Sequence, residues 1–317
     1  MRAVETSASR IDILALGEPM VEFNQTGEGE GRLYLQGCGG DTTNFAIAAA
    51  RQGAAVGYLS ALGDDANGRM LRALWAAEHV DAASVATDPA AYTAIYFVTH
   101  DANGHHFDFF RRGSAASRMM PAALPRARIA AARVVHYSGI SLAISASARD
   151  TCEALAAIAH EAGTQVSFDT NLRLKLWPLA EARAAIEAAI GRADICLPSA
   201  DDMTALTGLV DADAIVDHCL RLGAKTVALK CGAAGAIVGD AGRRERIAPF
   251  RCRAVDATGA GDVFGGAFIA RLVAGDDLAT AGRYAAAAAA LSTEGYGAVA
   301  PIPRAAQVVA ALAAARQ

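Results

Sequence analysis

Near the end of the 317-residue chain the sequence reads Val255-Asp256-Ala257-Thr258-Gly259-Ala260-Gly261-Asp262-Val263-Phe264-Gly265-Gly266-Ala267-Phe268. The turn at residues 259–261 contains only small residues, which let a backbone approach an anion closely. An apolar, helix-like stretch follows, and the free amides at the start of a helix stabilise negative charge. Asp262 stands in the first turn, where it can accept a proton from a substrate hydroxyl. The stretch predicts a phosphoryl-transfer site, although such turns are often only structural.

The composition indicates a soluble globular protein. Hydrophobic residues make up 53% and charged residues 20%, and the formal net charge is −4. These values argue against a basic nucleic-acid surface. No apolar stretch is long enough to span a bilayer, and residues 1–10 lack the apolar core of a signal peptide. We therefore expect a cytoplasmic protein without nucleic-acid or membrane partners.

The cysteines and histidines do not form a metal-binding or disulfide pattern. The six cysteines contain no C-x-x-C pair, so buried free thiols are expected. His105 and His106 are adjacent, and neighbours on a strand point to opposite faces. We expect no metal bound directly by the protein.

Short β-rich runs alternate with Ala-rich helical stretches along most of the chain. This alternation predicts the fold class α/β, with a mostly parallel central sheet flanked by helices on both faces. Ligands of such sheets lie at the carboxyl ends of the strands. The expected strands are residues 11–16, 133–137, 165–168, 194–197 and 226–229, and the expected helices are residues 148–162, 179–191, 211–222, 260–273, 278–291 and 304–314.

Two segments interrupt the alternation and predict hairpins. Residues 20–35 have a Gly-rich tip, and residues 93–111 turn around Asp101-Ala102-Asn103-Gly104. Together they predict a small β-sheet lid, formed by inserted segments at about 18–36 and 92–113 of a single domain, 1–317. Phe107, Phe109 and Arg111 share one face of the second hairpin. That face is either the underside of a lid over a ligand, or an aromatic face packed on the domain with Arg111 at its rim.

Two distant motifs together resemble the PfkB (ribokinase-like) family of sugar kinases. The first is Gly39-Gly40-Asp41-Thr42-Thr43-Asn44, which opens a helix, and the second is residues 256–262. The resemblance covers nearly the whole chain and implies a ribokinase-like fold. Within the family the chain is most similar to 2-dehydro-3-deoxygluconate (KDG) kinases, in residues 17–25, 168–177 and 295–303. It implies ATP-dependent phosphorylation of the 6-hydroxyl of KDG.

The resemblance also implies a substrate site and its catalytic residues. The substrate residues are Gly40, Asn44, Tyr96, Phe109, Arg111, Arg173 and Asp262, and the catalytic residues are Asp262 with the amides of Gly259, Ala260 and Gly261. A buried sugar carboxylate needs a cation, which Arg111 and Arg173 provide. The alternative for Arg173 is a structural salt bridge, for example with Asp169. Phe109 departs from the family pattern, because many relatives have a substrate-contacting tyrosine there.

The nucleotide side follows from the same resemblance. The expected contacts are Ser199, Lys230, Gly232, Gly235, Thr258, Gly259 and Gly261. Magnesium is expected with the ATP phosphates, and the region of Asp256 is the place for any potassium ion. Lys230 is expected to contact a phosphate, and the alternative is an ordinary surface lysine. No P-loop sequence occurs. Ser199-Ala200-Asp201-Asp202 replaces the Asn-x-x-Glu element of the family, and Asp202 is expected to retain the carboxylate role.

Several alternatives remain open at this stage. A fructokinase, a ribokinase or a kinase of the galacto epimer shares most of these motifs, and a non-catalytic sugar-binding relative belongs to a different class. Partners are expected to be a sugar acid and ATP, with homodimerisation through the lid. Because phosphoryl transfer is largely dissociative, an ordinary ionised aspartate at position 262 suffices to orient the hydroxyl and take its proton. Loss of Arg111 is expected to raise KM for KDG with almost no change in thermal stability.

Overall fold

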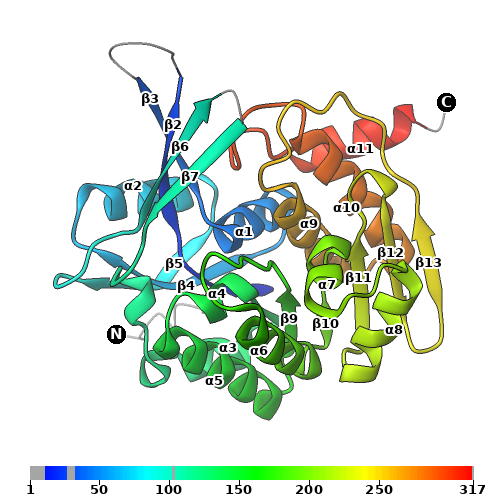
Figure 1. Cartoon of the computed structure of the whole chain (residues 1–317), viewed down its shortest axis with the longest axis horizontal. Coiled ribbons are helices and arrows are strands. Elements are labelled where there is room, and N and C mark those ends of the chain that lie inside the picture. The colour runs from blue at the N-terminus through cyan, green and yellow to red at the C-terminus, as the bar shows by residue number, and fades with distance from the viewer. Residues whose placement is uncertain (1–10, 27–32, 102–103, 316–317) are drawn as a thin grey trace, which may run out of the picture.

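The computed structural model describes residues 11–26, 33–101 and 104–315. A nine-stranded sheet runs through the molecule in the order β13-β12-β11-β10-β9-β8-β1-β4-β5 (Figure 1). Its strands are β1 Ile13–Leu16, β4 Val56–Gly63, β5 Asp81–Asp88, β8 Val134–Ser138, β9 Gln165–Asp169, β10 Ile195–Cys196, β11 Thr226–Lys230, β12 Ala236–Asp240 and β13 Arg244–Ile247.

The pairing of the strands confirms the mostly parallel α/β sheet. Every pair from β5 to β11 is parallel, while β12 and β13 continue the sheet as antiparallel strands. Strands β4 and β8 are buried along their whole length. Burial on both faces explains why neither strand alternates regularly between apolar and polar residues.

Helices cover both faces of the sheet. One apolar core lies under α1, α2, α9, α10 and α11, and the other under α3 to α8. The helices are α1 Asp41–Arg51, α2 Ala66–Ala77, α3 Arg126–Ala131, α4 Gly139–Ala143, α5 Ala146–Ala162, α6 Leu179–Arg192, α7 Ala200–Thr207, α8 Ala212–Leu222, α9 Ala260–Ala274, α10 Leu278–Ser292 and α11 Ala305–Ala314, with short 3-10 turns at Ala116–Arg118, Pro121–Ala123 and Gly232–Ala234. The six helices expected from the sequence are all present.

A small four-stranded sheet projects from one end of the molecule (Figure 1). Its order is β3-β2-β6-β7, with β2 Met20–Gln25, β3 Tyr34–Gly39, β6 Ile95–Asp101 and β7 Gly104–Phe110. Both predicted hairpins therefore join one sheet. Residues 27–32 and 102–103 of the predicted tips lie outside the described residues. Phe107 and Phe109 stack on the inner face with centroids 6.2 Å apart, and the guanidinium of Arg111 lies 5.7 Å from the Phe109 centroid.

Helices α1 and α9 pack closely because α9 has a glycine at the crossing. A Cβ at Gly266 would lie 2.3 Å from the carbonyl oxygen of Phe45 and 2.9 Å from Cβ of Ala48. Gly265, one residue earlier, would meet only the side chains of Leu197 and Phe45, at 3.1 Å and beyond. The backbones of the two helices can thus approach only while residue 266 has no side chain.

We expect Gly266→Ala to lower the free energy of unfolding by about 1–3 kcal/mol, as overpacking does. Alanine gains about 1 kcal/mol of helix propensity, so the steric conflict must exceed that gain. Chemical denaturation measures the change, and Gly265→Ala is the control with a smaller loss. Equal stability of both variants would contradict the close approach of the helices.

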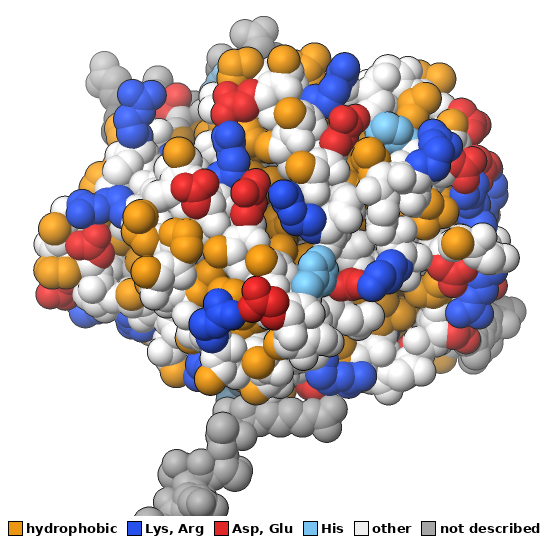
Figure 2. All heavy atoms as spheres, turned by 90° about the horizontal axis from the view of Figure 1, so that it is seen from below, with side chains coloured by type: hydrophobic (Ala, Val, Ile, Leu, Met, Phe, Trp, Pro, Cys, Tyr) orange, Lys and Arg blue, Asp and Glu red, His pale blue; other side chains and the backbone are white. Residues whose placement is uncertain are grey.

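Helices α3, α5 and α6 form the lower part of the molecule in Figure 1. Figure 2 shows the molecule from below, and charged side chains of both signs lie scattered among apolar ones. Ion pairs join these helices, as in Arg126–Glu161 and Arg149–Glu181, each at 2.6 Å. None of the described helices combines the length and the apolar character needed to cross a bilayer.

Candidate functional site

The two predicted motifs meet where α1 and α9 begin. Nδ2 of Asn44 on α1 donates a hydrogen bond to Oδ2 of Asp262 on α9 at 2.8 Å, across 218 residues of sequence. A Cβ at Gly259 would lie 3.3 Å from the same Nδ2 atom. Gly259 itself has φ 75°, a conformation that favours glycine. Asn44, Gly259 and Asp262 therefore form one cluster.

A second carboxylate, Asp41, faces this cluster from the first residue of α1. Its Oδ2 accepts hydrogen bonds from Oγ of Ser138, at the end of β8, and from Nδ2 of Asn171 at 3.2 Å. The same amide of Asn171 lies 3.5 Å from Oδ1 of Asp262. Asn171 has φ 27°, which is uncommon for a residue other than glycine. Its side chain thus bridges the two carboxylates.

Asp262 is more basic than the sequence suggested. Burial and the nearby charge of Asp41 raise its pKa to about 8, against the opposing effects of Asn44 and Lys230. Asp262 therefore differs from the ordinary ionised aspartate that would suffice for this role. The cause is tertiary, because Asp41 lies 221 residues away in the sequence. A carboxylate with this pKa is well matched to taking a proton near neutral pH.

The raised pKa predicts the pH dependence of turnover. If Asp262 must lose its proton to act as base, kcat/KM will rise with pH and reach half its maximum near pH 8. Steady-state rates between about pH 6 and pH 9 measure this. Asp41→Asn removes the charge that raises the pKa, so its midpoint should lie at lower pH. A wild-type profile that is flat over this range would contradict the assignment of the base.

One positively charged side chain, that of Lys230, lies beside the start of α9. Nζ of Lys230, at the end of β11, donates to Oδ2 of Asp169 at 2.5 Å, and a Cβ at Gly261 would lie 3.6 Å from Nζ. Lys230 is not the surface lysine of the alternative interpretation, because its side chain is 13% exposed. Burial raises the pKa of Asp169, while Lys230 opposes this. The lysine therefore lies at the predicted anion-binding turn.

The turn offers fewer free amides than the sequence suggested. The amide of Ala260 donates to the carbonyl oxygen of Ala257 at 3.2 Å, so it is already used. In the described part of the chain, the amides of Gly259 and Gly261 have no acceptor. Two main-chain donors, rather than three, are available to an anion, together with the dipole of α9.

The other residues predicted to bind the nucleotide lie in neighbouring loops. Gly232 and Gly235 have φ 55° and 91° in the loop after β11. Ser199 pairs with Lys230 in an isolated parallel bridge, and its Oγ caps α7. Thr258 donates from its amide and its Oγ1 to Oδ1 of Asp256, whose Oδ2 accepts from the amide of Gly297. All of these residues lie on the carboxyl-end side of the strands.

Two predicted residues have other partners in this structure. Asp202 accepts from Oγ1 of Thr170 at 3.0 Å and from the amide of Leu172 at 3.1 Å, so it supports the loop after β9. Arg173 is exposed, and its Nη1 donates to the carbonyl of Leu172 at 2.7 Å. The suggested salt bridge of Arg173 with Asp169 is absent from the described residues, because Asp169 pairs with Lys230.

Arg111 forms a buried ion pair that the sequence did not indicate. Its Nε donates to Oε2 of Glu18 at 2.6 Å, and the side chains are 11% and 0% exposed. Burial raises the pKa of Glu18, and the guanidinium opposes this rise. Nη2 lies 2.5 Å from the same oxygen, so both nitrogens face the Glu18 carboxylate. Loss of Arg111 is therefore expected to lower thermal stability, contrary to the prediction made from the sequence.

The ion pair lies next to the predicted sugar-binding glycine. A Cβ at Gly40 would lie 2.5 Å from the carbonyl oxygen of Glu18, and Gly40 has φ 101°. On the neighbouring strand, the hydroxyl of Tyr96 donates to Oε2 of Glu22 at 2.5 Å and covers Gly39. Phe109 is 42% exposed, with its ring 5.5 Å from that of Tyr96. The inner face of the small sheet thus covers the Gly-Gly turn.

A cavity of about 980 Å3 extends from the inner face of the small sheet to the loops at 256–258 and 296–300. Glu22, Phe107 and Thr258 are among its lining residues. A Cβ at Gly259 would lie 3.4 Å from Ala298, which also lines the cavity. The space therefore borders the cluster at Asp262 and is large enough for a small-molecule ligand.

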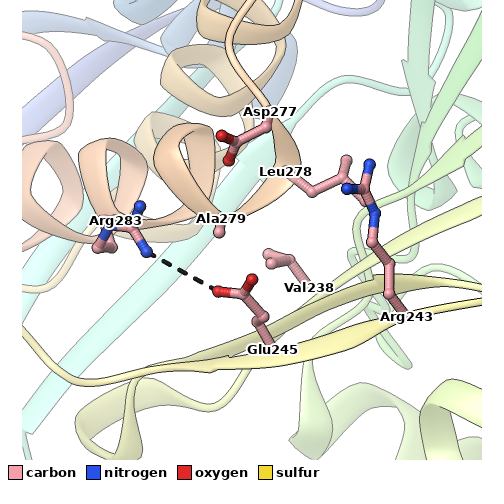
Figure 3. Close-up of a pocket in the computed structure, with 7 residues that line it drawn as sticks. All are labelled: Val238, Arg243, Glu245, Asp277, Leu278, Ala279 and Arg283. Carbon is pink, nitrogen blue, oxygen red and sulfur yellow. Dashed lines mark ion pairs between the residues drawn. The ribbon is translucent and has the colours of Figure 1, made fainter.

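A second hollow, of about 210 Å3, lies between strands β12 and β13 and the start of α10 (Figure 3). Its charged side chains already have partners. Arg283 and Glu245 form an ion pair at 3.8 Å, and Asp277 caps α10 through the amide of Thr280. This hollow contains none of the predicted site residues.

Sequence reasoning missed four residues of the site: Glu18, Asp41, Asp169 and Asn171. Each lies inside one of the stretches that carry the family resemblance, without having received a role in binding or catalysis. The only signal was position, because each lies at or just after the end of a strand, or opens a helix, at the carboxyl ends of the sheet. Among the described residues, no group of three His, Cys, Asp or Glu side chains is arranged to hold a metal ion.

Comparisons with known proteins show what the whole chain is similar to. The sequence model of the pfkB family carbohydrate kinases matches residues 10–305. The chain is 34% identical over 318 residues to a 2-dehydro-3-deoxygluconokinase of Thermoproteus tenax, covering 96% of this chain and 95% of that protein. It is also 34% identical over 317 residues to fructokinase-1 of Zea mays, with 96% and 98% covered. A crystal structure of fructokinase with bound ATP from Xylella fastidiosa superposes with a TM-score of 0.89 at 25% identity, covering 97% and 100%.

Proposed function

The chain belongs to the pfkB family of carbohydrate kinases, and we propose that it transfers the γ-phosphoryl group of ATP to the 6-hydroxyl of 2-dehydro-3-deoxy-D-gluconate. The observation that carries the choice of a sugar acid is Arg111. Its guanidinium supplies charged donors, is paired with Glu18, and belongs to a side chain that is 11% exposed. The backbone carbonyl of Glu18 in turn adjoins Gly40. A carboxylate satisfies such donors better than a neutral hydroxyl does, because a charge-assisted hydrogen bond is about twice as strong.

The proposed chemistry uses residues at the start of α9. Asp262 orients the 6-hydroxyl and takes its proton, while Asn44 holds the carboxylate in place. Lys230, the amides of Gly259 and Gly261 and the helix dipole stabilise charge on the transferring phosphoryl group. Magnesium bound with ATP would supply neutralisation of the phosphate charge. The small sheet acts as the lid, and its closure keeps water from the phosphoryl group.

The substrate contacts that we assign are Gly40, Asn44, Tyr96, Phe109, Arg111, Arg173 and Asp262. The nucleotide contacts are Ser199, Lys230, Gly232, Gly235, Thr258, Gly259 and Gly261. A potassium ion beside Asp256 stays a prediction, supported by the way this carboxylate joins the 256–258 turn to Gly297. We also infer one domain over residues 1–317, since β1 runs directly into lid strand β2.

A coupled ATP-consumption assay tests the substrate. We expect kcat/KM for 2-dehydro-3-deoxygluconate to exceed that for fructose or ribose by at least about tenfold. The galacto epimer, included in the same assay, determines the stereochemical preference. Highest activity on fructose or ribose would overturn the sugar-acid assignment, and no ATP consumption with any sugar would favour a non-catalytic sugar-binding protein.

The outer face of the lid supports a dimer through this sheet. Phe97 stacks on Phe23 at 5.1 Å and contacts Tyr34 and Phe110 edge-on at 5.4 and 5.9 Å. Phe110 is 54% exposed. Exposed aromatic clusters on a sheet with two edge strands are typical of association surfaces.

We expect light scattering to give the mass of a dimer for the wild type and of a monomer for Phe110→Lys. The charged side chain would have to be desolvated in the aromatic interface, which weakens association. Met120→Lys is the control, because Met120 is 56% exposed in the 119–124 segment, outside the lid. A wild-type monomer, or a dimeric Phe110→Lys variant, would contradict dimerisation through this face.

A further inference from the structure

The carboxylate of Glu18 pairs with Arg111, the cation that we assign to substrate binding. Glu18 lies just after the end of β1, and its side chain is fully buried. Oε2 accepts from Nε of Arg111 at 2.6 Å, and Oε1 accepts from Oγ of Ser114 at 2.5 Å. Glu18 precedes strand β2, and its partners Arg111 and Ser114 follow strand β7. Its side chain therefore links the segment before the small sheet to the segment after it.

We propose that Glu18 is a specificity-determining residue, whose charge sets how strongly the site favours an anionic over a neutral sugar. This inference rests on the proposed function only in using Arg111 as a substrate contact. The ion pair is neutral, so a neutral sugar meets no net charge there. A sugar carboxylate brings a second anion to a single guanidinium, and the two anions repel each other.

Two nitrogens of Arg111 already face Glu18, which makes this competition direct. Nε donates to Oε2 at 2.6 Å, and Nη2 lies 2.5 Å from the same oxygen. An incoming carboxylate that shares this guanidinium would therefore lie close to the Glu18 carboxylate. Asp41 adds further negative charge nearby, since it also raises the pKa of Glu18. Removing the charge of Glu18 should therefore favour acidic substrates selectively.

The test compares kcat/KM for 2-dehydro-3-deoxygluconate with kcat/KM for fructose in the wild type and in Glu18→Gln. The glutamine keeps the shape of the side chain, and its oxygen can accept from Ser114 as the carboxylate does. We expect the ratio of acid to neutral sugar to rise about tenfold. Ser114→Ala is the matched control, because it removes a hydrogen bond to Glu18 without changing charge and should leave the ratio unchanged.

A positioning role without charge competition would lower both rates in parallel, so an unchanged or falling ratio in Glu18→Gln overturns the proposal. If Glu18→Gln does not fold, Glu18→Asp replaces it. Its shorter side chain weakens the pair, and the ratio must rise by about two- to threefold. The ratio in the wild type separately tests the proposed function, since a preference for fructose would refute the sugar-acid assignment while the shift in the variants could still be measured.

Discussion

Replacing Asp262 with asparagine is expected to lower kcat by about 100-fold or more, the range for loss of a general base. The new side chain has the same size as the aspartate and can still accept from Nδ2 of Asn44, so KM for the sugar should change little. Steady-state kinetics on the wild type and the variant measure both constants. Asp150→Asn, an exposed carboxylate on α5, is the control and should have wild-type rates. Near-wild-type turnover of Asp262→Asn would refute the role of the base.

The same substitution is expected to stabilise the protein at alkaline pH. The folded-state pKa of Asp262 is about 8, above its ordinary value of 3.8. Between these values the folded protein holds a proton that the unfolded chain releases, so stability is lost as pH rises through this window. The amide of the variant cannot ionise and avoids repulsion with Asp41. Thermal unfolding at pH values above the folded-state pKa should give a higher Tm for Asp262→Asn than for the wild type, whereas a lower Tm would contradict the raised pKa.

Replacing Arg111 with alanine is expected to raise KM for the sugar acid about 30-fold or more, because a charge-assisted contact contributes roughly 1.5–3 kcal/mol. It should also lower the free energy of unfolding by about 3 kcal/mol, because Glu18 is left buried without its cation. Protonation of Glu18 limits this loss, since burial already raises its pKa. Substrate saturation curves and chemical denaturation measure the two effects.

The double variant Glu18→Gln, Arg111→Ala separates binding from stability. Without a buried, unpaired carboxylate it should recover most of the lost stability, while KM for the sugar acid stays high. Recovery of both properties would mean that Arg111 acts only through the fold. Failure to recover stability would mean that the ion pair is not the source of the loss.

Local patterns were sufficient to predict five of the nine strands of the large sheet and six of the helices. Strand β8 is mostly apolar because both of its faces are buried, and the Ala-rich helices follow from high helix propensity. The hairpins were predicted from their turn residues and alternation. These signals act over a few residues, and the structure confirms them.

The partners of charged side chains were less predictable, because they come from distant parts of the chain. Lys230 was expected at a phosphate, and it lies beside Gly261 while held by Asp169. Asp202 was expected at the nucleotide, but it accepts hydrogen bonds from the loop after β9. Nothing in the sequence around Arg111 indicated that Glu18, 93 residues earlier, would pair with it.

The order of apolar runs, turns and small residues was enough to specify the α/β architecture, the lid strands and the turn before Asp262, since each depends on backbone preferences of neighbouring residues. The electrostatic state of the site required the folded chain. Packing of α1 against α9 brings Asp41 and Asn44 to Asp262, and burial then turns proximity into a raised pKa. Charge interactions depend on distance and dielectric environment, and both are set only when the elements have assembled.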